Sequence, residues 1–242
     1  STSSCGNSRF GCWVCTVVDK DKSMENLIDS GEDWMQPLLE LRQDLKDTQD
    51  PEKKLEIRDF KRRDGKVIFF TDGTEKITPG PYKIEFRKEF LKKLLDAQNK
   101  VRKDGPDPTM SLILEEEIHE IQRIWRVEQG DWENSVYAIY EEITGVNLSS
   151  VKEDLGGFTH VEQEILDGIC EKNNVPKLLV SKLLNAEFDS QGMTRHSKIY
   201  PKIGKILSEE WRTWDEIETI KDELKDKRKK KLQNEPFSRE TK

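Results

Sequence analysis

Apolar residues recur at helical spacing along most of the chain. Trp34, Leu38, Leu41 and Leu45 follow one another at intervals of four, three and four, which places them on one face of a helix. The same criterion predicts further helices near Leu27, from Ile84 to Val101, along the stripe of Leu114, Ile118, Ile121 and Trp125, after Thr159 and after Thr213. The chain is therefore predicted to be mainly α-helical.

The helical pattern is interrupted between about residues 60 and 80. The dipeptides Asp64-Gly65 and Asp72-Gly73, which are typical of turns, bracket a β-branched and aromatic run over residues 66–71. We therefore expect a small β-hairpin here, with residues 75–78 as its weaker second strand. Because two strands alone are only marginally stable in water, the hairpin should pack against the helices.

Composition excludes several classes of protein. Of the 242 residues, 37% are charged, and the net charge of −7 disfavours a surface that binds nucleic acid everywhere, although it allows a local basic patch. Apolar runs such as residues 67–70 are far shorter than the roughly 20 residues that cross a bilayer, and the first residues do not resemble a signal peptide. We expect a cytoplasmic protein without a membrane partner.

Three of the four cysteines lie close together near the start of the chain. Cys5, Cys12 and Cys15 have the spacing C-x6-C-x2-C, in a stretch rich in Gly, Ser and Asn that is the least helical part of the sequence. Two cysteines three residues apart can point both sulfurs at one centre, and the preceding loop lets Cys5 supply a third ligand. A tetrahedral zinc ion and a cubane iron–sulfur cluster both fit this pattern, and both require a fourth ligand.

Two alternatives concern these cysteines and Cys170. The three clustered thiols could instead be reduced and unliganded around Phe10 and Trp13, although the polar residues beside them would make a poor core. Cys170 is a candidate for the fourth ligand, but its helical position beside Ile165 and Ile169 favours a free cysteine that fills a core.

The residues around the cysteine motif resemble a known family. Residues 5–18 read Cys-Gly-Asn-Ser-Arg-Phe-Gly-Cys-Trp-Val-Cys-Thr-Val-Val and, with residues 19–24, are similar to the signature of DndC, the sulfurtransferase family of bacterial DNA phosphorothioation. The stretches Thr78-Pro-Gly-Pro-Tyr82 and Gly157-Phe-Thr-His-Val-Glu162 also fit the carboxy-terminal half of that family. Only the cysteine stretch is strongly specific.

The resemblance implies a cofactor, a reaction and partners. The [4Fe-4S] cluster ligands of the family map onto Cys5, Cys12 and Cys15, and a further family cysteine lies shortly upstream of the motif. With a cysteine desulfurase and the other Dnd proteins, members of the family replace a non-bridging phosphate oxygen of DNA with sulfur. They also carry an amino-terminal ATP pyrophosphatase domain, which is where ATP would bind.

The sequence departs from the family in one large respect. It contains no Ser-Gly-Gly-Lys-Asp-Ser-like loop that could hold ATP phosphates, so adenylation chemistry is assigned to none of its residues. We therefore expect the carboxy-terminal part of a longer or naturally split protein. Its expected organisation is a cysteine-rich iron–sulfur loop over residues 1–22, a helical domain over residues 23–232 and a flexible tail over residues 233–242.

Positive charge gathers near the end of the chain, where six of the seven residues 225–231 are basic. The candidates for contact with DNA phosphates in this run are Lys227, Arg228, Lys229, Lys230 and Lys231. Cations are equally suited to the C-terminal end of a helix, because they meet the negative end of its dipole. Arg9, inside the cysteine loop, could contact a DNA phosphate, balance the charge of a cluster or pair with a carboxylate.

The sequence leaves three functional hypotheses. The first is an iron–sulfur-bearing, mainly helical module of a DndC-like sulfurtransferase. The second is a zinc-stapled helical module that docks Dnd partners or DNA without chemistry of its own. The third is a DNA-binding adaptor that acts through the basic helix at the carboxy-terminal end.

Overall fold

The computed structural model describes residues 13–70, 76–148, 160–190 and 199–234, and the regular structure in these ranges is helical. The helices are α1 (Lys22–Asp29), η1 (Asp33–Met35), α2 (Gln36–Asp47), α3 (Lys54–Ile57), α4 (Ile84–Asp104), α5 (Glu115–Gln129), α6 (Ser135–Thr144), α7 (His160–Asn173), α8 (Lys177–Phe188), α9 (Ile199–Leu207) and α10 (Trp214–Asn234). The prediction of a mainly α fold is confirmed.

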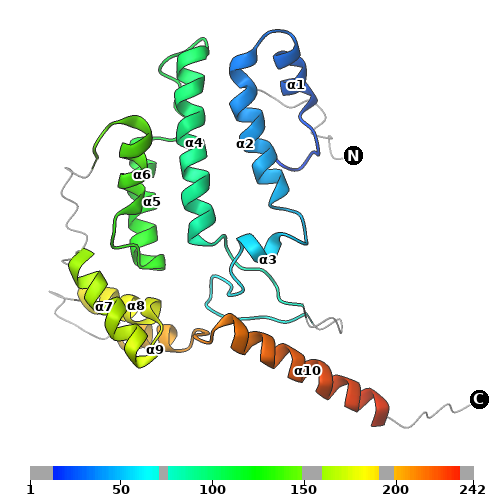
Figure 1. Cartoon of the computed structure of the whole chain (residues 1–242), viewed down its shortest axis with the longest axis vertical. Coiled ribbons are helices and arrows are strands. Elements are labelled where there is room, and N and C mark those ends of the chain that lie inside the picture. The colour runs from blue at the N-terminus through cyan, green and yellow to red at the C-terminus, as the bar shows by residue number, and fades with distance from the viewer. Residues whose placement is uncertain (1–12, 71–75, 149–159, 191–198, 235–242) are drawn as a thin grey trace, which may run out of the picture.

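Helix α4 runs through the middle of the helical body, with α1 and α2 on one side and α5 and α6 on the other (Figure 1). Its Leu91 and Leu95 belong to the main core, where they join Ile118 and Trp125 of α5 and four residues of α6. Two members of the stripe predicted for α5 are thus buried. Leu114 is instead 54% exposed, because it is the N-cap residue and precedes the first turn of α5.

A second apolar cluster lies on the other side of α4. It is formed by Met24 of α1, Met35 of η1, Leu38 of α2 and Val101 of α4, all of them buried. Trp13, the first residue that the structure describes, packs against this cluster. The cluster therefore connects the end of the cysteine motif to the helical body.

A buried polar network joins α5 to α6. The side chain of Gln122, which has no exposed area, accepts a hydrogen bond from Val136 N at 3.1 Å and donates one to Asp131 at 3.4 Å. Asp131 in turn accepts bonds from the backbone N–H and the hydroxyl of Ser135, at 3.0 and 2.6 Å. Because these groups satisfy one another, their burial does not carry the penalty of unpaired polar atoms.

The expected β-hairpin is not confirmed. The described part of this segment, which omits residues 71–75, contains no strand but only an isolated antiparallel bridge between Phe69 and Ile77. Two backbone hydrogen bonds of 2.7 and 2.8 Å flank that bridge. A second isolated bridge joins Arg58 to Tyr82, so the segment pairs in two short places instead of one ladder. The short pairing fits the marginal stability of an isolated two-stranded ladder in water.

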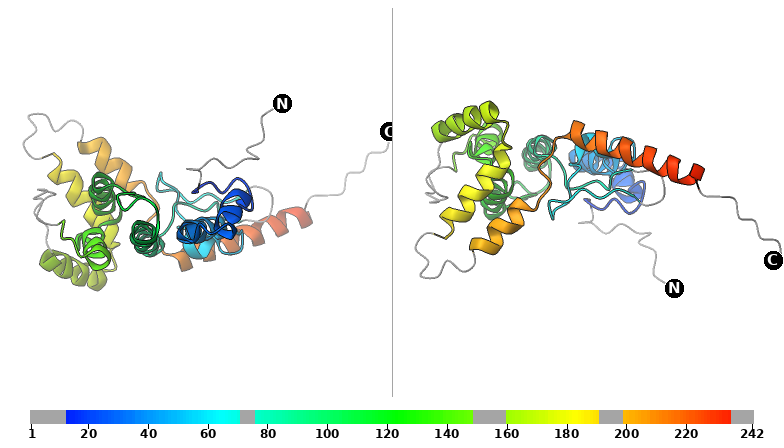
Figure 2. Two further views of the ribbon diagram at one scale, coloured as in Figure 1. Left: turned by 90° about the horizontal axis from the view of Figure 1, so that it is seen from above. Right: turned by 90° about the horizontal axis from the view of Figure 1, so that it is seen from below.

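The carboxy-terminal helices form a separate layer. Helix α8 packs against α7, α9 and α5, whereas α10 projects away from this layer (Figures 1 and 2). At the start of α10, Thr213 N donates to the Glu216 carboxylate at 2.7 Å, and Glu216 N lies 3.4 Å from the Thr213 hydroxyl. The predicted capping box is therefore present. The similar box predicted at Thr159 lies outside the described residues. Helix α10 continues to Asn234, into the expected tail.

Candidate metal centre and basic surfaces

The cysteine motif is only partly visible in the structure. Cys5, Cys12 and Arg9 lie outside the described residues, so their placement is not part of the site geometry. Cys15 is described as a free, partly exposed cysteine in the short segment that leads into α1. Its thiol is therefore not enclosed in a core, and it is accessible as a ligand.

Helix α2 holds the backbone that follows Cys15. The guanidinium of Arg42 donates hydrogen bonds to Val18 O at 2.5 Å and to Asp19 O at 3.3 Å. Arg42 is only 1% exposed, which is unusual because arginine side chains are mostly exposed in folded proteins. A buried, charged donor bonded to two successive carbonyls fixes the course of this segment relative to α2.

Further polar contacts extend the same attachment. Lys46 forms an ion pair with Asp19 at 2.7 Å, and its ammonium lies 3.4 Å from Thr16 O. Gln49 donates to the Thr16 hydroxyl at 2.6 Å. The hydrogen bond and the charge of Lys46, with a smaller contribution from Arg42, lower the pKa of Asp19. The segment thus lies along α2 and is contacted by side chains from successive turns of that helix.

The end of this segment is fixed by the start of α1. The carboxylate of Asp21 accepts a hydrogen bond from Met24 N at 3.1 Å and so caps the helix, and Met24 itself is buried. Together with Trp13 on the apolar cluster, this cap holds both ends of residues 13–21. Cys15 therefore lies on a segment that is positioned by packing at one end and by a helix cap at the other.

Cys15 is the one cysteine of the motif that the structure describes, and it offers a single thiolate donor. Among the described residues, no group of three His, Cys, Asp or Glu side chains could hold a metal ion. A metal centre would consequently depend on Cys5 and Cys12 together with Cys15. The fixed backbone and accessible thiol of Cys15 fit such a centre.

Cys170 is in a different part of the molecule. It is buried in α7, with 4% of its surface exposed, and it is free. Figure 1 shows α7 beyond α5, on the other side of α4 from α1 and α2. The fold therefore does not bring Cys170 to Cys15, and the interpretation of Cys170 as a packed core residue is the one that agrees with its burial. Its helical neighbours Ile165 and Ile169, expected to share that core, are instead more than half exposed.

The basic run near the end of the chain lies on α10. Lys227, Arg228, Lys229 and Lys230 are exposed on the part of the helix that projects from the body (Figure 2). Lys227 is 4.0 Å from Glu223, a contact at the limit of an ion pair, whereas Lys229 and Lys230 pair with no residue that the structure describes. The side chain of Lys231 lies outside the described part. These cations are accessible to a polyanion.

Sequence reasoning missed a second group of cations. Arg58, Lys61, Arg62, Arg63, Arg87 and Lys182 line one cleft, which we call the basic cleft. The first four lie within six residues, which is a local signal that could have been found. Arg87 and Lys182 carry no such signal, because only the packing of α4 and α8 brings them to the same place.

The comparisons with known proteins do not identify a family. No protein-family model matches the chain, and searches of curated proteins and of solved structures found no similar protein. Among the described residues, no helix is long and apolar enough to cross a membrane.

Proposed function

We propose that this chain is the iron–sulfur-cluster-bearing, helical part of a DndC-like sulfurtransferase that helps to insert sulfur into the DNA backbone. The observation that carries the proposal is the attachment of the segment after Cys15 to α2 by the buried Arg42. A cluster ligand needs a backbone that keeps its position when the metal binds, because the surrounding groups orient the ligand. In the sequence, Cys5 and Cys12 shortly precede Cys15, so the motif offers three thiols next to this fixed segment.

The charges beside the segment also favour this assignment. Arg42 and Lys46 both bind backbone oxygens within four residues of Cys15. Thiolate ligands carry negative charge, and nearby cations stabilise that charge by Coulomb attraction. The cysteine-rich loop of the sequence prediction would therefore join the helical body next to the cationic side chains of Arg42 and Lys46.

The rest of the proposal concerns partners and location. Lys229 and Lys230 of α10, which pair with no described residue, supply a surface for DNA phosphates, because cations that bind phosphates release counterions from DNA. Cooperation with a cysteine desulfurase and other Dnd proteins, in the cytoplasm, is supported by the resemblance of residues 5–24 alone.

The cofactor is tested by purifying the chain without oxygen and reconstituting it with iron and sulfide. We expect a broad absorption band near about 400 nm, with iron and labile sulfide in the protein. Substituting Cys12→Ser or Cys15→Ser should remove the band, whereas the matched control Cys170→Ser should keep it. Stoichiometric zinc without labile sulfide would instead show a zinc-stapled module and contradict the proposal.

The reaction is tested separately in cells that contain the cysteine desulfurase and the other Dnd proteins. Incorporation of radioactive sulfur into DNA should be lost with Cys15→Ser and retained with Cys170→Ser. If Cys15→Ser removed the cluster but left sulfur incorporation unchanged, the cluster would be structural and its role in sulfur insertion would be excluded.

A further inference from the structure

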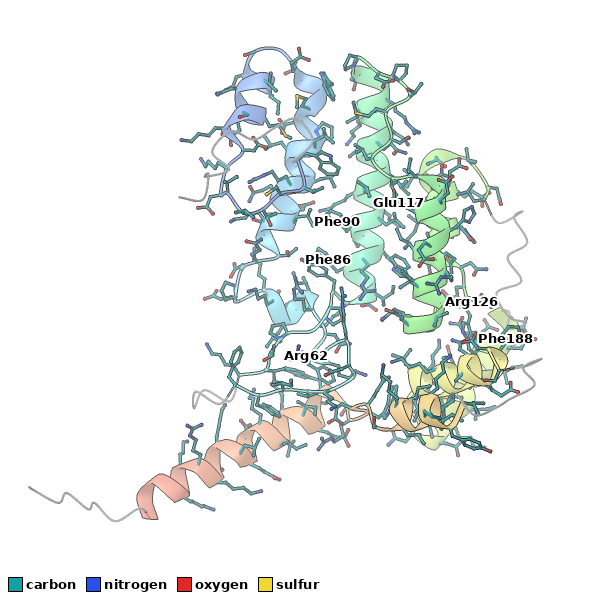
Figure 3. All side chains as sticks on the ribbon, turned by 180° about the vertical axis from the view of Figure 1, so that it is seen from behind. Arg62, Phe86, Phe90, Glu117, Arg126 and Phe188 are labelled. Atoms are coloured by element: carbon teal, nitrogen blue, oxygen red, sulfur yellow. The ribbon has the colours of Figure 1, made fainter. Side chains whose placement is uncertain are left out.

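The basic cleft is a cavity of about 690 Å³ where four parts of the chain meet. It lies between the loop of residues 58–65, the start of α4, the end of α5 and α8, and Figure 3 shows Arg62 in this loop, between α4 and α10. Its six cations face only three carboxylates, those of Asp59, Glu128 and Glu209. The lining therefore has an excess of positive charge although the whole chain is acidic.

The loop that carries four of these cations is fixed at its beginning. Asp59 N donates to Pro81 O at 2.8 Å, and Gly80 N donates to Asp59 O at 2.7 Å. The backbones of Gly80 and the loop lie so close together that a Cβ atom added to Gly80 would be 1.7 Å from Lys61 O. The backbone that presents the cations is thus in direct contact with a second backbone segment.

The end of the loop is held by the segment before α10. Glu210 N donates to Gly65 O at 2.6 Å, and Gly65 has a φ of +77°, in the left-handed region that favours glycine. The ammonium of Lys61 lies over the ring of Trp211, 4.9 Å from its centroid. Since both ends are attached, the backbone that carries the cations is ordered before any ligand arrives, which lowers the entropic cost of binding.

Some of the cations already have partners. Lys182 forms an ion pair with Glu209 at 2.6 Å, and Arg87 donates to Tyr82 O at 2.8 Å. Arg58 donates to Gly80 O at 3.1 Å, but its Nε is buried without a hydrogen-bond partner among the described residues. The cleft consequently contains guanidinium groups that its own walls satisfy only in part.

Arg62 and Arg63 are exposed, and their guanidinium groups form no hydrogen bond or ion pair with any residue that the structure describes. Burial lowers the pKa of Arg87, and the like charge of Arg63 lowers it further, while Glu128 acts in the opposite direction. Arg63 and Arg87 line the same cavity, so an anion bound in the cleft would be attracted by both guanidinium groups.

We propose that the basic cleft binds a compact polyphosphate, either free or as the phosphate chain of a nucleotide. Arginine forks match phosphate oxygens in geometry and charge, and the cavity has the size of a small-molecule site. An extended nucleic acid fits less well, because the cavity is of small-molecule size and its lining also carries the carboxylates of Asp59, Glu128 and Glu209. This inference is independent of the proposed iron–sulfur function.

The proposal is tested by isothermal titration of the full chain with inorganic tripolyphosphate and, separately, with ATP. We expect both to bind, and we expect the double substitution Arg62→Gln with Arg63→Gln to weaken binding by at least about tenfold. Because both side chains are exposed, circular dichroism should show unchanged helix content and melting. The matched control, Lys229→Gln with Lys230→Gln on α10, removes the same charge and should change affinity by less than about twofold.

The outcomes distinguish the sources of the phosphate. Equal affinity for tripolyphosphate and ATP would assign the cleft to the phosphate chain alone, whereas much tighter binding of ATP would identify a nucleotide as the ligand. Absence of binding by both probes would overturn the proposal, as would an equal loss of affinity in the α10 control. A 20-base-pair duplex that binds more tightly and displaces tripolyphosphate would show an extended nucleic-acid site and overturn it as well.

Discussion

The attachment of the cysteine segment to α2 depends on one buried side chain, and it can be removed by the substitution Arg42→Met. Methionine keeps an unbranched apolar stem of similar length, so the packing of α2 should remain. The substitution removes the hydrogen bonds to Val18 O and Asp19 O, which are 2.5 and 3.3 Å long. Between its two fixed ends, the segment then keeps only the polar contacts that it makes with Lys46 of α2 and Gln49 of the turn after α2.

Two opposing contributions set the free-energy cost of Arg42→Met for the attachment of the segment. A hydrogen bond from a charged donor contributes about 1.5–3 kcal/mol, and the longer bond to Asp19 less, so that their loss costs about 2–4 kcal/mol. Against this, the Nε of Arg42 is buried without a partner, and removing an unsatisfied buried donor recovers about 1 kcal/mol. The net cost is about 1–3 kcal/mol, which corresponds to an increase of about 5-fold to 150-fold in local opening of the segment.

Native-state proteolysis measures this opening at a defined bond. Lys20 is exposed and lies in the attached segment, and a lysine-specific protease should cleave after it faster in the variant by the factor above. Lys172, exposed in α7, is the internal reference, because cleavage there should be unchanged if the effect is local. Quantifying both products by mass spectrometry separates local opening from global unfolding.

The matched control is Lys46→Met, which removes an ion pair whose Asp19 side chain is 92% exposed. Solvent screens such a pair, so this control should accelerate cleavage after Lys20 far less than Arg42→Met. The reasoning is refuted if Arg42→Met leaves the cleavage rate within about twofold of wild type. It is refuted equally if the two variants have the same effect.

Three further predictions follow from other parts of the molecule. Gly80→Ala should destabilise the chain by about 1–3 kcal/mol in urea unfolding, since the new Cβ would lie 1.7 Å from Lys61 O. An unchanged unfolding midpoint would contradict the close contact between these two backbone segments. Lys229→Gln with Lys230→Gln should flatten the salt dependence of DNA binding by about two units of slope, and an unchanged slope would exclude this patch. The Glu210 carboxylate has its pKa lowered by hydrogen bonds from the guanidinium two residues later. Its stabilising contribution is therefore present at neutral pH and is lost as the pH falls below about 5, so Glu210→Gln should reduce the acid sensitivity of unfolding.

Periodicity predicted the helices well, because burying one face of a helix requires a repeat that the sequence displays directly. The run over residues 84–101 is helical and buries one face of α4, and Ile118 and Trp125 of the predicted stripe are buried, whereas Leu114 is exposed. The capping box at Thr213 was equally local, since its partner Glu216 is three residues away. In each case the information lies within a few turns of one helix.

The features that periodicity missed involve polar groups satisfied across long sequence separations. Gln122 and Arg42 are nearly or fully buried, yet their residue types predict exposure. Each is tolerated because a partner from elsewhere in the chain meets it: Val136 for Gln122, and the carbonyls of Val18 and Asp19 for Arg42. A one-dimensional pattern contains the polar residue but not the partner that makes its burial possible.

Charge shows the same difference between sequence and structure. The net charge of −7 suggests a chain that repels polyanions, but an electrostatic potential depends on where charges gather and on the walls around them. Packing brings Arg87 and Lys182 to the loop that carries Arg62 and Arg63, so a cationic cavity exists inside an acidic protein. Binding of an anion there would be governed by this local excess, and substitutions of acidic residues far from the cleft should alter it little because salt screens charges beyond about 8–10 Å.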